Sequence, residues 1–150
     1  MDIGIEKVDT HKGIIVKALL DSGAMGMFMD QKMVAKYGFR LQKLERPVMV
    51  RNVDRTNNSA GAIIYQVDAN MYYKGYIERM RMNVCDLGKT DIILGMTWLQ
   101  AHNPEINWET GEVKMTRCPP LYGRNTRLKE EKVRKRVKRV ATLEGEKIVR

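Results

Sequence analysis

The sequence is poor in the residues that cross-link small secreted domains and build metal sites. It has only two cysteines, Cys85 and Cys118, and two histidines. Two cysteines so far apart make neither a disulfide framework nor a zinc site, so we expect free thiols, a reducing compartment, and no metal or other cofactor. Residues 1–10 lack an apolar signal-peptide core, and no apolar run approaches the roughly 20 residues of a membrane span. We therefore expect a cytosolic, soluble protein without a membrane partner.

Acidic residues are scarce in one part of the chain only. The 150 residues carry 27 Lys and Arg against 18 Asp and Glu, a net charge of +9. Residues 117–150 hold 12 of the basic and 4 of the acidic residues, net +8, which leaves 15 and 14, net +1, for residues 1–116. The sequence therefore predicts a nearly neutral domain over residues 1–116 and a basic tail over residues 117–150. The 43% of hydrophobic residues suffices for one core.

One acid stands where a charge is costly. Residues 14–20 are apolar apart from Lys17, and they run directly into Asp21, Ser22 and Gly23. This pattern predicts a mostly buried strand that delivers one carboxylate to a tight turn. Burial of an isolated carboxylate is unfavourable, so chains keep Asp mainly on their surfaces. Asp21 is therefore the first candidate for a catalytic residue.

A second pattern lies downstream, at residues 91–99. It reads Asp-Ile-Ile-Leu-Gly-Met-Thr-Trp-Leu and predicts a short apolar strand at 92–94, a turn at Gly95 and a short helix. An Asp-Ser-Gly-Ala after an apolar strand, followed about seventy residues later by Ile-Leu-Gly and a Trp-Leu helix, resembles the retropepsins. More narrowly, it resembles the protease segment of gypsy-class LTR retrotransposon polyproteins. The resemblance covers roughly residues 14–115.

The resemblance implies both a fold and an activity. The implied fold is all-β, a retropepsin-like acid protease half-barrel with one or two short helices, here followed by the basic tail. The implied activity is that of an aspartic endopeptidase that cleaves the polyprotein in which it is encoded. Such an enzyme would work in the cytosol, with retrotransposon virus-like particles as one setting.

Aspartic proteases need two carboxylates that share one proton: one activates the attacking water, and the other donates to the scissile carbonyl. This sequence has one Asp-Ser-Gly and no internal repeat. Asp9 lacks the glycine that should follow, and Asp91 lies at the exposed start of its strand. A homodimer supplies the second acid, because a two-fold axis through the site brings both copies of Asp21 together. We therefore expect an inactive monomer and an active homodimer.

The resemblance also implies roles for the neighbours of Asp21. Ser22 would hydrogen-bond across the dimer beneath the acids, and Gly23 would let the backbone approach them. Ala24 occupies a place where some aspartic proteases have a hydroxyl residue. An alanine cannot donate a hydrogen bond to the charged pair, so we expect optimal activity in mild rather than strong acid.

Two further expectations concern the surroundings of this acid. The Ile93, Leu94 and Gly95 element would pack beneath the site. Met25 stands where the family pattern often has Thr or Ser, which leaves open a catalytically dead copy that serves as a dimerisation domain. The retained acid, hydroxyl, glycine and Ile-Leu-Gly element favour an active enzyme.

Residues 47–67 predict a hairpin, with strands at 47–53 and 62–67 and a polar turn at 54–61. By resemblance this hairpin is the flap, the lid that closes over a bound peptide, and a plain surface hairpin is the alternative. A peptide would bind in extended form between the lid and Asp21. The expected flap and substrate-binding residues are Asn52, Val53, Asp54, Ala60 and Gly61.

Weaker patterns predict the remaining elements. Residues 3–8 read as an edge strand, and Asp30 as the N-cap of a helix over 31–37 that ends at Gly38. Thr97 is expected to cap the helix after Gly95, with Trp98, Leu99 and Ala101 facing inward and His102 near its end as a favourable cation rather than a catalytic base. Residues 105–108 and 113–115 predict a final hairpin.

Basic residues suggest nucleic acid as an alternative partner. The tyrosines at 72, 73 and 76, close to Lys74, Arg79 and Arg81, could stack bases, although a turn at 72–75 and a strand at 76–84 explain them more simply. In the tail, residues 128–143 predict a basic helix with valines at helical spacing. Such a helix is a linker to a following domain or a weak nucleic-acid contact centred on residues 127–139.

Overall fold

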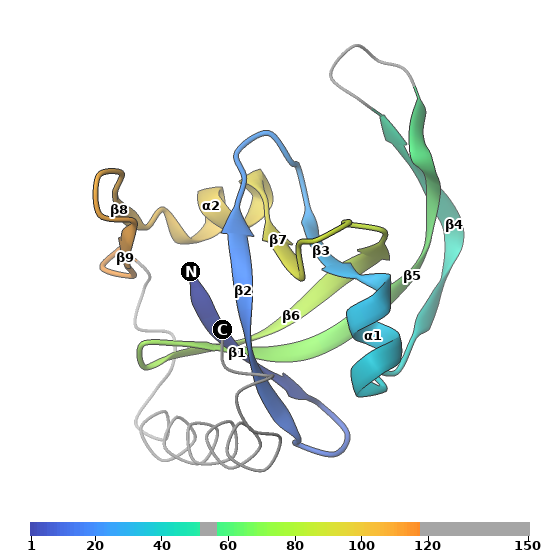
Figure 1. Ribbon diagram of the computed structural model, residues 1–150, viewed down its shortest axis with the longest axis horizontal. Helices are drawn as coiled ribbons and strands as arrows, with labels where there is room; N and C mark the ends of the chain where they lie inside the picture. The colour runs from blue at the N-terminus through green and yellow to red at the C-terminus, as the bar shows by residue number, and fades with distance from the viewer. Residues whose placement is uncertain (52–56, 118–150) are drawn as a thin grey trace.

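The computed structural model describes residues 1–51 and 57–117 (Figure 1). In these ranges it has two helices, α1 (Gln31–Tyr37) and α2 (Met96–His102). No helix there is long and apolar enough to span a membrane. The predicted all-β fold with one or two short helices is confirmed, and the predicted basic helix over 128–143 lies outside the described residues. The strands are β1 (Asp2–Lys7), β2 (Gly13–Leu20), β3 (Met27–Asp30), β4 (Gln42–Arg51), β5 (Asn57–Tyr73), β6 (Tyr76–Cys85), β7 (Ile92–Leu94), β8 (Glu105–Asn107) and β9 (Glu112–Lys114).

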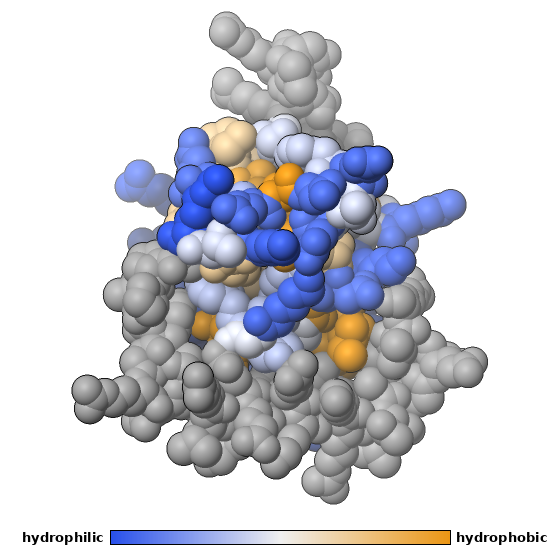
Figure 2. Space-filling view, turned by 90° about the vertical axis from the view of Figure 1, so that its left-hand side faces the viewer, coloured by the Kyte–Doolittle hydropathy of each residue, from blue (hydrophilic) through white to orange (hydrophobic). Residues whose placement is uncertain are grey.

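Six of these strands close into a barrel. The main sheet has the order β1-β2-β7-β3-β6-β5-β4, and β1 also pairs with β5, so the sheet returns to its first strand. The predicted final hairpin is present as β8 and β9, which form a separate two-stranded sheet near α2 (Figure 1). Figure 2 shows that face of the molecule, where mostly hydrophilic side chains surround small separate hydrophobic areas.

The first strand is central rather than peripheral. Ile3 pairs with Val16 of β2, and Ile5 pairs with both Ile14 of β2 and Met71 of β5. The prediction of an edge strand at residues 3–8 is therefore wrong. Four consecutive residues of β1 are buried, which requires cover on both faces of the strand.

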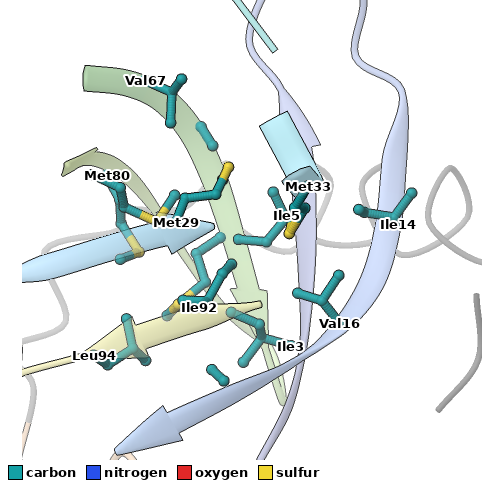
Figure 3. Close-up of a cluster of buried hydrophobic side chains, with 14 of the residues drawn as sticks. Ile3, Ile5, Ile14, Val16, Met29, Met33, Val67, Met80, Ile92 and Leu94 are labelled. Atoms are coloured by element: carbon teal, nitrogen blue, oxygen red, sulfur yellow. The ribbon is translucent and has the colours of Figure 1, made fainter. Parts of the chain in front are cut away.

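Apolar side chains from all six barrel strands fill the interior (Figure 3). Methionines contribute much of this core, and Met29, Met71 and Met82 have no solvent exposure at all. The unbranched methionine side chain fits irregular gaps between strands. The labelled residues in Figure 3 are each 5% exposed or less, and they are Ile3, Ile5, Ile14, Val16, Met29, Met33, Val67, Met80, Ile92 and Leu94.

Helix α1 begins and ends as predicted. The side chain of Asp30 accepts a hydrogen bond from the Lys32 amide at 3.1 Å, which caps the first turn. Gly38 ends the helix in the left-handed region with φ +67°. The second carboxylate oxygen of Asp30 accepts from the Leu87 amide at 2.9 Å, so this buried acid also holds the loop before β7.

The hairpin predicted at residues 47–67 is present, with longer strands and a shorter turn, and its role as a lid stays a prediction. β4 and the first half of β5 extend beyond the barrel as a two-stranded arm (Figure 1). Residue 51 pairs with residue 57 and Met49 pairs with Ala62, so β5 contains a bulge in which Gly61 has φ +75°. The prediction of a turn over residues 54–61 is therefore corrected: β5 begins at residue 57.

The tyrosines at 72, 73 and 76 belong to a β-hairpin. Tyr73 pairs with Tyr76 across a two-residue turn in which Lys74 and Gly75 both have positive φ. Tyr73 is buried, and its hydroxyl donates to the Val113 carbonyl at 2.9 Å. The ring of Tyr73 is therefore not available for base stacking, and all three tyrosines lie at the paired ends of β5 and β6, so the strand pair is the better interpretation of this cluster.

Candidate active site

Two parallel strands place Asp21. Leu20, the last residue of β2, pairs with Leu94, the last residue of β7. The Asp21 amide then donates to the Leu94 carbonyl at 3.1 Å, which extends the ladder by one residue. Asp21 therefore lies where both strands end, and it is half-buried. The sequence motifs around residues 21 and 94 are brought together by this pairing, as predicted.

A tight turn follows Asp21 and folds back on its carboxylate. The Gly23 amide donates to Asp21 Oδ1 at 2.9 Å, and the Ala24 amide donates to the Asp21 carbonyl at 3.2 Å. A Cβ atom on Gly23 would lie 3.1 Å from Oδ1, so a side chain there would crowd the acid. Ser22 and Gly23 are exposed and Ala24 is half-buried. The turn thus leaves the carboxylate partly open to solvent.

Strand β7 lies between the two strands that the turn connects. β2 pairs with β7 on one side, and β3 pairs with β7 on the other, with Met27 opposite Leu94 and Phe28 opposite Ile93. Ile93 is half-buried and Leu94 is buried. β7 thus pairs with the strand before the turn at 21–26 and with the strand after it, and the support of a catalytic site by Ile93 and Leu94 stays a prediction.

Gly95 fits closely against this turn. A Cβ atom at Gly95 would overlap the carbonyl oxygens of Ala24 and Gly26. The Gly95 amide donates to the Gly26 carbonyl at 2.9 Å, and the Met96 amide donates to the Ala24 carbonyl at 2.6 Å. A glycine is required here for close approach rather than for its backbone angles, because its φ of −89° is open to any residue.

Thr97 has a different role from the predicted one. Gly95 is the N-cap of α2, no side chain caps this helix, and Thr97 lies within its first turn. The Thr97 amide donates to the Met25 carbonyl at 3.0 Å, and the Thr97 hydroxyl donates to the same oxygen. Thr97 therefore anchors the turn after Asp21. The sequence near Thr97 does not reveal this role, because the bonded carbonyl belongs to a distant residue.

The inward face of α2 also differs from the expectation. Trp98 is buried and Leu99 is half-buried as predicted, whereas Ala101 is exposed. His102 was expected as a helix-end cation, but it is 8% exposed, and its Nε2 lies 3.1 Å from Glu78 Oε2. Residues 98 and 102 are four apart and share one helix face, whereas residue 101 lies on the flank.

The predicted lid residues are only partly described. Asn52, Val53 and Asp54 lie outside the described residues. Ala60 and Gly61 belong to β5 within the arm.

Two large apolar side chains close to Asp21 in sequence are exposed: Leu19, at 49%, and Met25, at 71%.

Two other acids lie away from this turn, and the thiol of Cys85 is unreactive. Asp9 accepts from the Thr10 amide in the β1–β2 turn, and Asp91 precedes β7 at the end opposite to Leu94. Burial raises the pKa of the Cys85 thiol to about 11, so Cys85 is a poor nucleophile. Within residues 1–51 and 57–117, no three His, Cys, Asp or Glu side chains gather as a metal site would require.

Comparison with known proteins finds a matching family and several similar structures. The model of the PEG10/RTL1 protease domain family matches residues 17–119. Among solved structures, the retroviral protease-like domain of Ddi1 from Leishmania major is 19% identical, with 78% of this chain and 87% of that chain covered and a TM-score of 0.49. EIAV protease in complex with the inhibitor HBY-793 is 20% identical, with 71% and 89% covered and a TM-score of 0.49. Lpg0085 from Legionella pneumophila, a protein of unknown function, is 12% identical, with 68% and 85% covered and a TM-score of 0.37.

The family match spans both sequence motifs, most of the barrel, the hairpin of β4 and β5, and α2. The resemblance inferred from the Asp-Ser-Gly-Ala and Ile-Leu-Gly motifs is confirmed by this match. This chain belongs to the PEG10/RTL1 protease domain family and is a retropepsin-like protease domain.

Proposed function

We propose that this chain is an aspartic endopeptidase that acts as a homodimer, with Asp21 of each copy in a shared site. The observation that carries the proposal is the placement of Asp21. This half-buried acid lies at the joint end of β2 and β7, on a turn held by backbone hydrogen bonds from Gly95, Met96 and Thr97. A carboxylate that is fixed in position but open to solvent is well placed for catalysis, whereas its partial burial does not stabilise the fold.

The proposed mechanism needs two carboxylates, and this requires a second copy of the chain. The two alternative acids, Asp9 and Asp91, are remote from the turn after Asp21, so among residues 1–51 and 57–117 we assign one catalytic carboxylate to each copy. A two-fold axis beside Asp21 would supply the other. The exposed Leu19 and Met25 flank this acid, and apolar surface of this kind is favoured where a second copy or a substrate covers it.

In the proposed reaction the two Asp21 carboxyl groups share one proton. The ionised one takes a proton from a water molecule, whose oxygen attacks the scissile carbonyl carbon, while the protonated one donates to the carbonyl oxygen. Collapse of the tetrahedral intermediate breaks the C–N bond: the carboxyl group that took the proton of the water gives it to the leaving amine, and the other carboxylate takes back a proton from a hydroxyl of the intermediate. The products are a carboxylic acid and an amine, and the dyad returns to its starting state.

We propose that the substrate is an extended peptide segment, bound between Asp21 and the arm of β4 and β5. The residues we assign to its binding are the lid set of Asn52, Val53, Asp54, Ala60 and Gly61, with Ser22, Gly23 and Ala24 supporting the acid. A retrotransposon polyprotein is the substrate we infer from the sequence resemblance. The added strand would use main-chain hydrogen bonds for affinity and side-chain pockets for selectivity.

The decisive experiment replaces Asp21 by Asn and assays cleavage of a long polypeptide, with and without a statine-type inhibitor. We expect the wild-type chain to cleave in mild acid, to be blocked by the inhibitor and to sediment as a dimer. Asp21→Asn should lose at least about a thousandfold in kcat and remain folded. Asp9→Asn is the matched control, since it alters an exposed turn carboxylate, and it should retain full activity.

Equal cleavage by the wild-type chain and Asp21→Asn would contradict the proposal. A folded dimer with no cleavage of any polypeptide would favour the alternative, a dimerisation domain without catalytic activity. Activity that stays proportional to protein concentration far below the dimer dissociation constant would contradict the shared site.

A second activity is suggested by the uneven distribution of charge. Residues 117–150 carry a net charge of +8, and residues 127–139 are the centre of this charge. We propose that this segment gives a weak, salt-dependent contact with nucleic acid. Removal of residues 118–150 should abolish retention on single-stranded RNA at low salt and leave peptide cleavage intact. Loss of cleavage with retention unchanged would contradict this division of roles.

A further inference from the structure

Four side chains from two elements meet in a buried polar cluster on the barrel. Glu78 of β6 accepts from Trp98 Nε1 at 2.8 Å, and its other oxygen lies 3.1 Å from His102 Nε2. The Tyr76 hydroxyl lies 3.2 Å from His102 Nδ1. The Trp98 and His102 rings are in contact, with centroids 4.7 Å apart. We call Tyr76, Glu78, Trp98 and His102 the α2 anchor.

One tautomer of His102 gives each of these contacts of the α2 anchor a donor and an acceptor. With the proton of His102 on Nε2, that nitrogen and the Trp98 nitrogen each donate to one oxygen of Glu78. The Tyr76 hydroxyl then donates to His102 Nδ1. The side chains of Glu78 and His102 are 13% and 10% exposed, so these hydrogen bonds are little weakened by water. The anchor therefore fixes α2 at two points, one helical turn apart.

The opposite end of α2 holds the turn after Asp21. Gly95, Met96 and Thr97 donate backbone hydrogen bonds to the carbonyl groups of Gly26, Ala24 and Met25, respectively. α2 has only seven residues, so about 10 Å separates its two ends. A short helix transmits a change of position along its axis, because its packed side chains and backbone deform little. A shift at residue 102 is thus carried to the turn that presents Asp21.

We propose that the α2 anchor is the positioning element of the catalytic turn, so that Glu78 sets the placement of Asp21 through α2. The inference rests on the proposed protease activity. Productive geometry in a shared site tolerates little displacement, and an error of about 1 Å can cost up to a hundredfold in rate. Loss of the anchor should therefore lower kcat more than it weakens peptide binding.

The chain supplies a matched control for this test. Glu6 of β1 is also a buried carboxylate beside a histidine: it is 1% exposed, His11 Nδ1 lies 3.0 Å away, and Asn70 Nδ2 donates at 3.3 Å. Glu6 pairs with Gly13 at the start of β2, whereas Asp21 follows its other end. Glu6→Ala should therefore destabilise the barrel to a similar degree without moving the turn.

The experiment compares Glu78→Ala, Glu78→Gln and Glu6→Ala by kcat per active site, with sites counted by titration with a tight statine-type inhibitor. We expect Glu78→Ala to lower kcat per site about tenfold with KM changed less than about twofold. Glu78→Gln should restore kcat to within about threefold, because the amide can still bond Trp98 and the other tautomer of His102. Glu6→Ala should keep kcat per site within about twofold. Equal losses in both alanine variants, or no loss in Glu78→Ala, would overturn the inference.

A second measurement needs no catalysis and separates this inference from the proposed function. Amide hydrogen exchange at Met96 and Thr97 should rise at least about tenfold in Glu78→Ala relative to Glu6→Ala. If Glu78→Ala does not fold, Tyr76→Phe removes one hydroxyl only and should raise the same exchange rates about threefold. Unchanged exchange at Met96 and Thr97 would overturn the anchor even if Asp21 proves catalytic. Faster exchange in a chain without protease activity would preserve the anchor and reject the protease.

Discussion

The backbone of Gly95 lies directly against that of Gly26, with the Gly95 amide donating to the Gly26 carbonyl at 2.9 Å. This contact joins the end of β7 to the end of the turn that carries Asp21. Because it is made by main-chain atoms of two residues without side chains in the way, it fixes the turn independently of side-chain rotamers. The turn that carries Asp21 therefore depends on Gly95, where a side chain does not fit.

Substitution of Gly95 by Ala tests this packing. The added Cβ would overlap the carbonyl oxygens of Ala24 and Gly26, so we expect a loss of about 2 to 3 kcal/mol in the free energy of unfolding. Gly111→Ala is the control: Gly111 has φ +75°, but an added Cβ would meet no atom within 4 Å, so backbone strain alone should cost about 1 kcal/mol. Urea denaturation measures both. A smaller loss at position 95 than at 111 would contradict the packing argument.

Asp68 of β5 accepts hydrogen bonds from the side chains of Arg79 and Arg81 of β6, and this group of charges should make stability depend on acid pH. Hydrogen bonds from Arg81 and Arg79 lower the pKa of Asp68 to about 2, although its burial acts in the opposite direction. A lowered pKa in the folded state gives stability that is present above the ordinary Asp pKa of 3.8 and is lost as the pH falls toward 2.

We therefore expect wild type to be more stable than Asp68→Asn at pH 6, with the difference shrinking by about 1 kcal/mol between pH 5 and pH 2. This change is small because both arginine side chains are exposed, at 62% and 60%, and solvent weakens the pairing. Urea titrations at fixed ionic strength across this range measure it. A difference between the two proteins that grows toward pH 2 would contradict the assigned sign.

Cys85 should be chemically inert in the folded chain. Burial, followed by the charges of Asp30 and Asp86, raises the pKa of its thiol from 9.0 to about 11. At pH 8 the thiolate fraction is then about a hundredfold below that of an unperturbed cysteine, so alkylation by iodoacetamide should be about a hundredfold slower than in urea. The measurement uses a Cys118→Ser background to isolate one thiol. Equal rates in the folded and unfolded chains would refute the assigned environment.

Local patterns predicted much of the fold because they have local causes. The Asp30 cap and the Gly38 stop of α1 depend on hydrogen bonds and backbone angles within one helix. The strand that precedes Asp21 and the strand at 92–94 could be predicted because both are runs of mainly apolar residues. Their meeting at one site was anticipated from the two motifs together, and the structure supplies the parallel pairing that achieves it.

The errors concern contacts between distant parts of the chain. Whether β1 is an edge strand depends on β5, which pairs with it from more than sixty positions away. The burial of His102 depends on Glu78, and the role of Thr97 depends on the carbonyl of Met25. A histidine at a helix end is ordinarily a favourable cation, and a threonine at a helix start is ordinarily a cap. The sequence around His102 and Thr97 gives no reason to expect a different role for either residue.

The pairing of Leu20 with Leu94 has a consequence for synthesis of the chain. The contacts that hold the turn at 21–26 against the rest of the barrel, from the Leu94 carbonyl to the amides of Gly95, Met96 and Thr97, are made by residues translated long after the turn itself. A nascent chain that ends before residue 94 therefore lacks the contacts that hold this turn against β7 and α2. For the proposed protease, this order of synthesis would delay assembly of the site until residue 102 has been made.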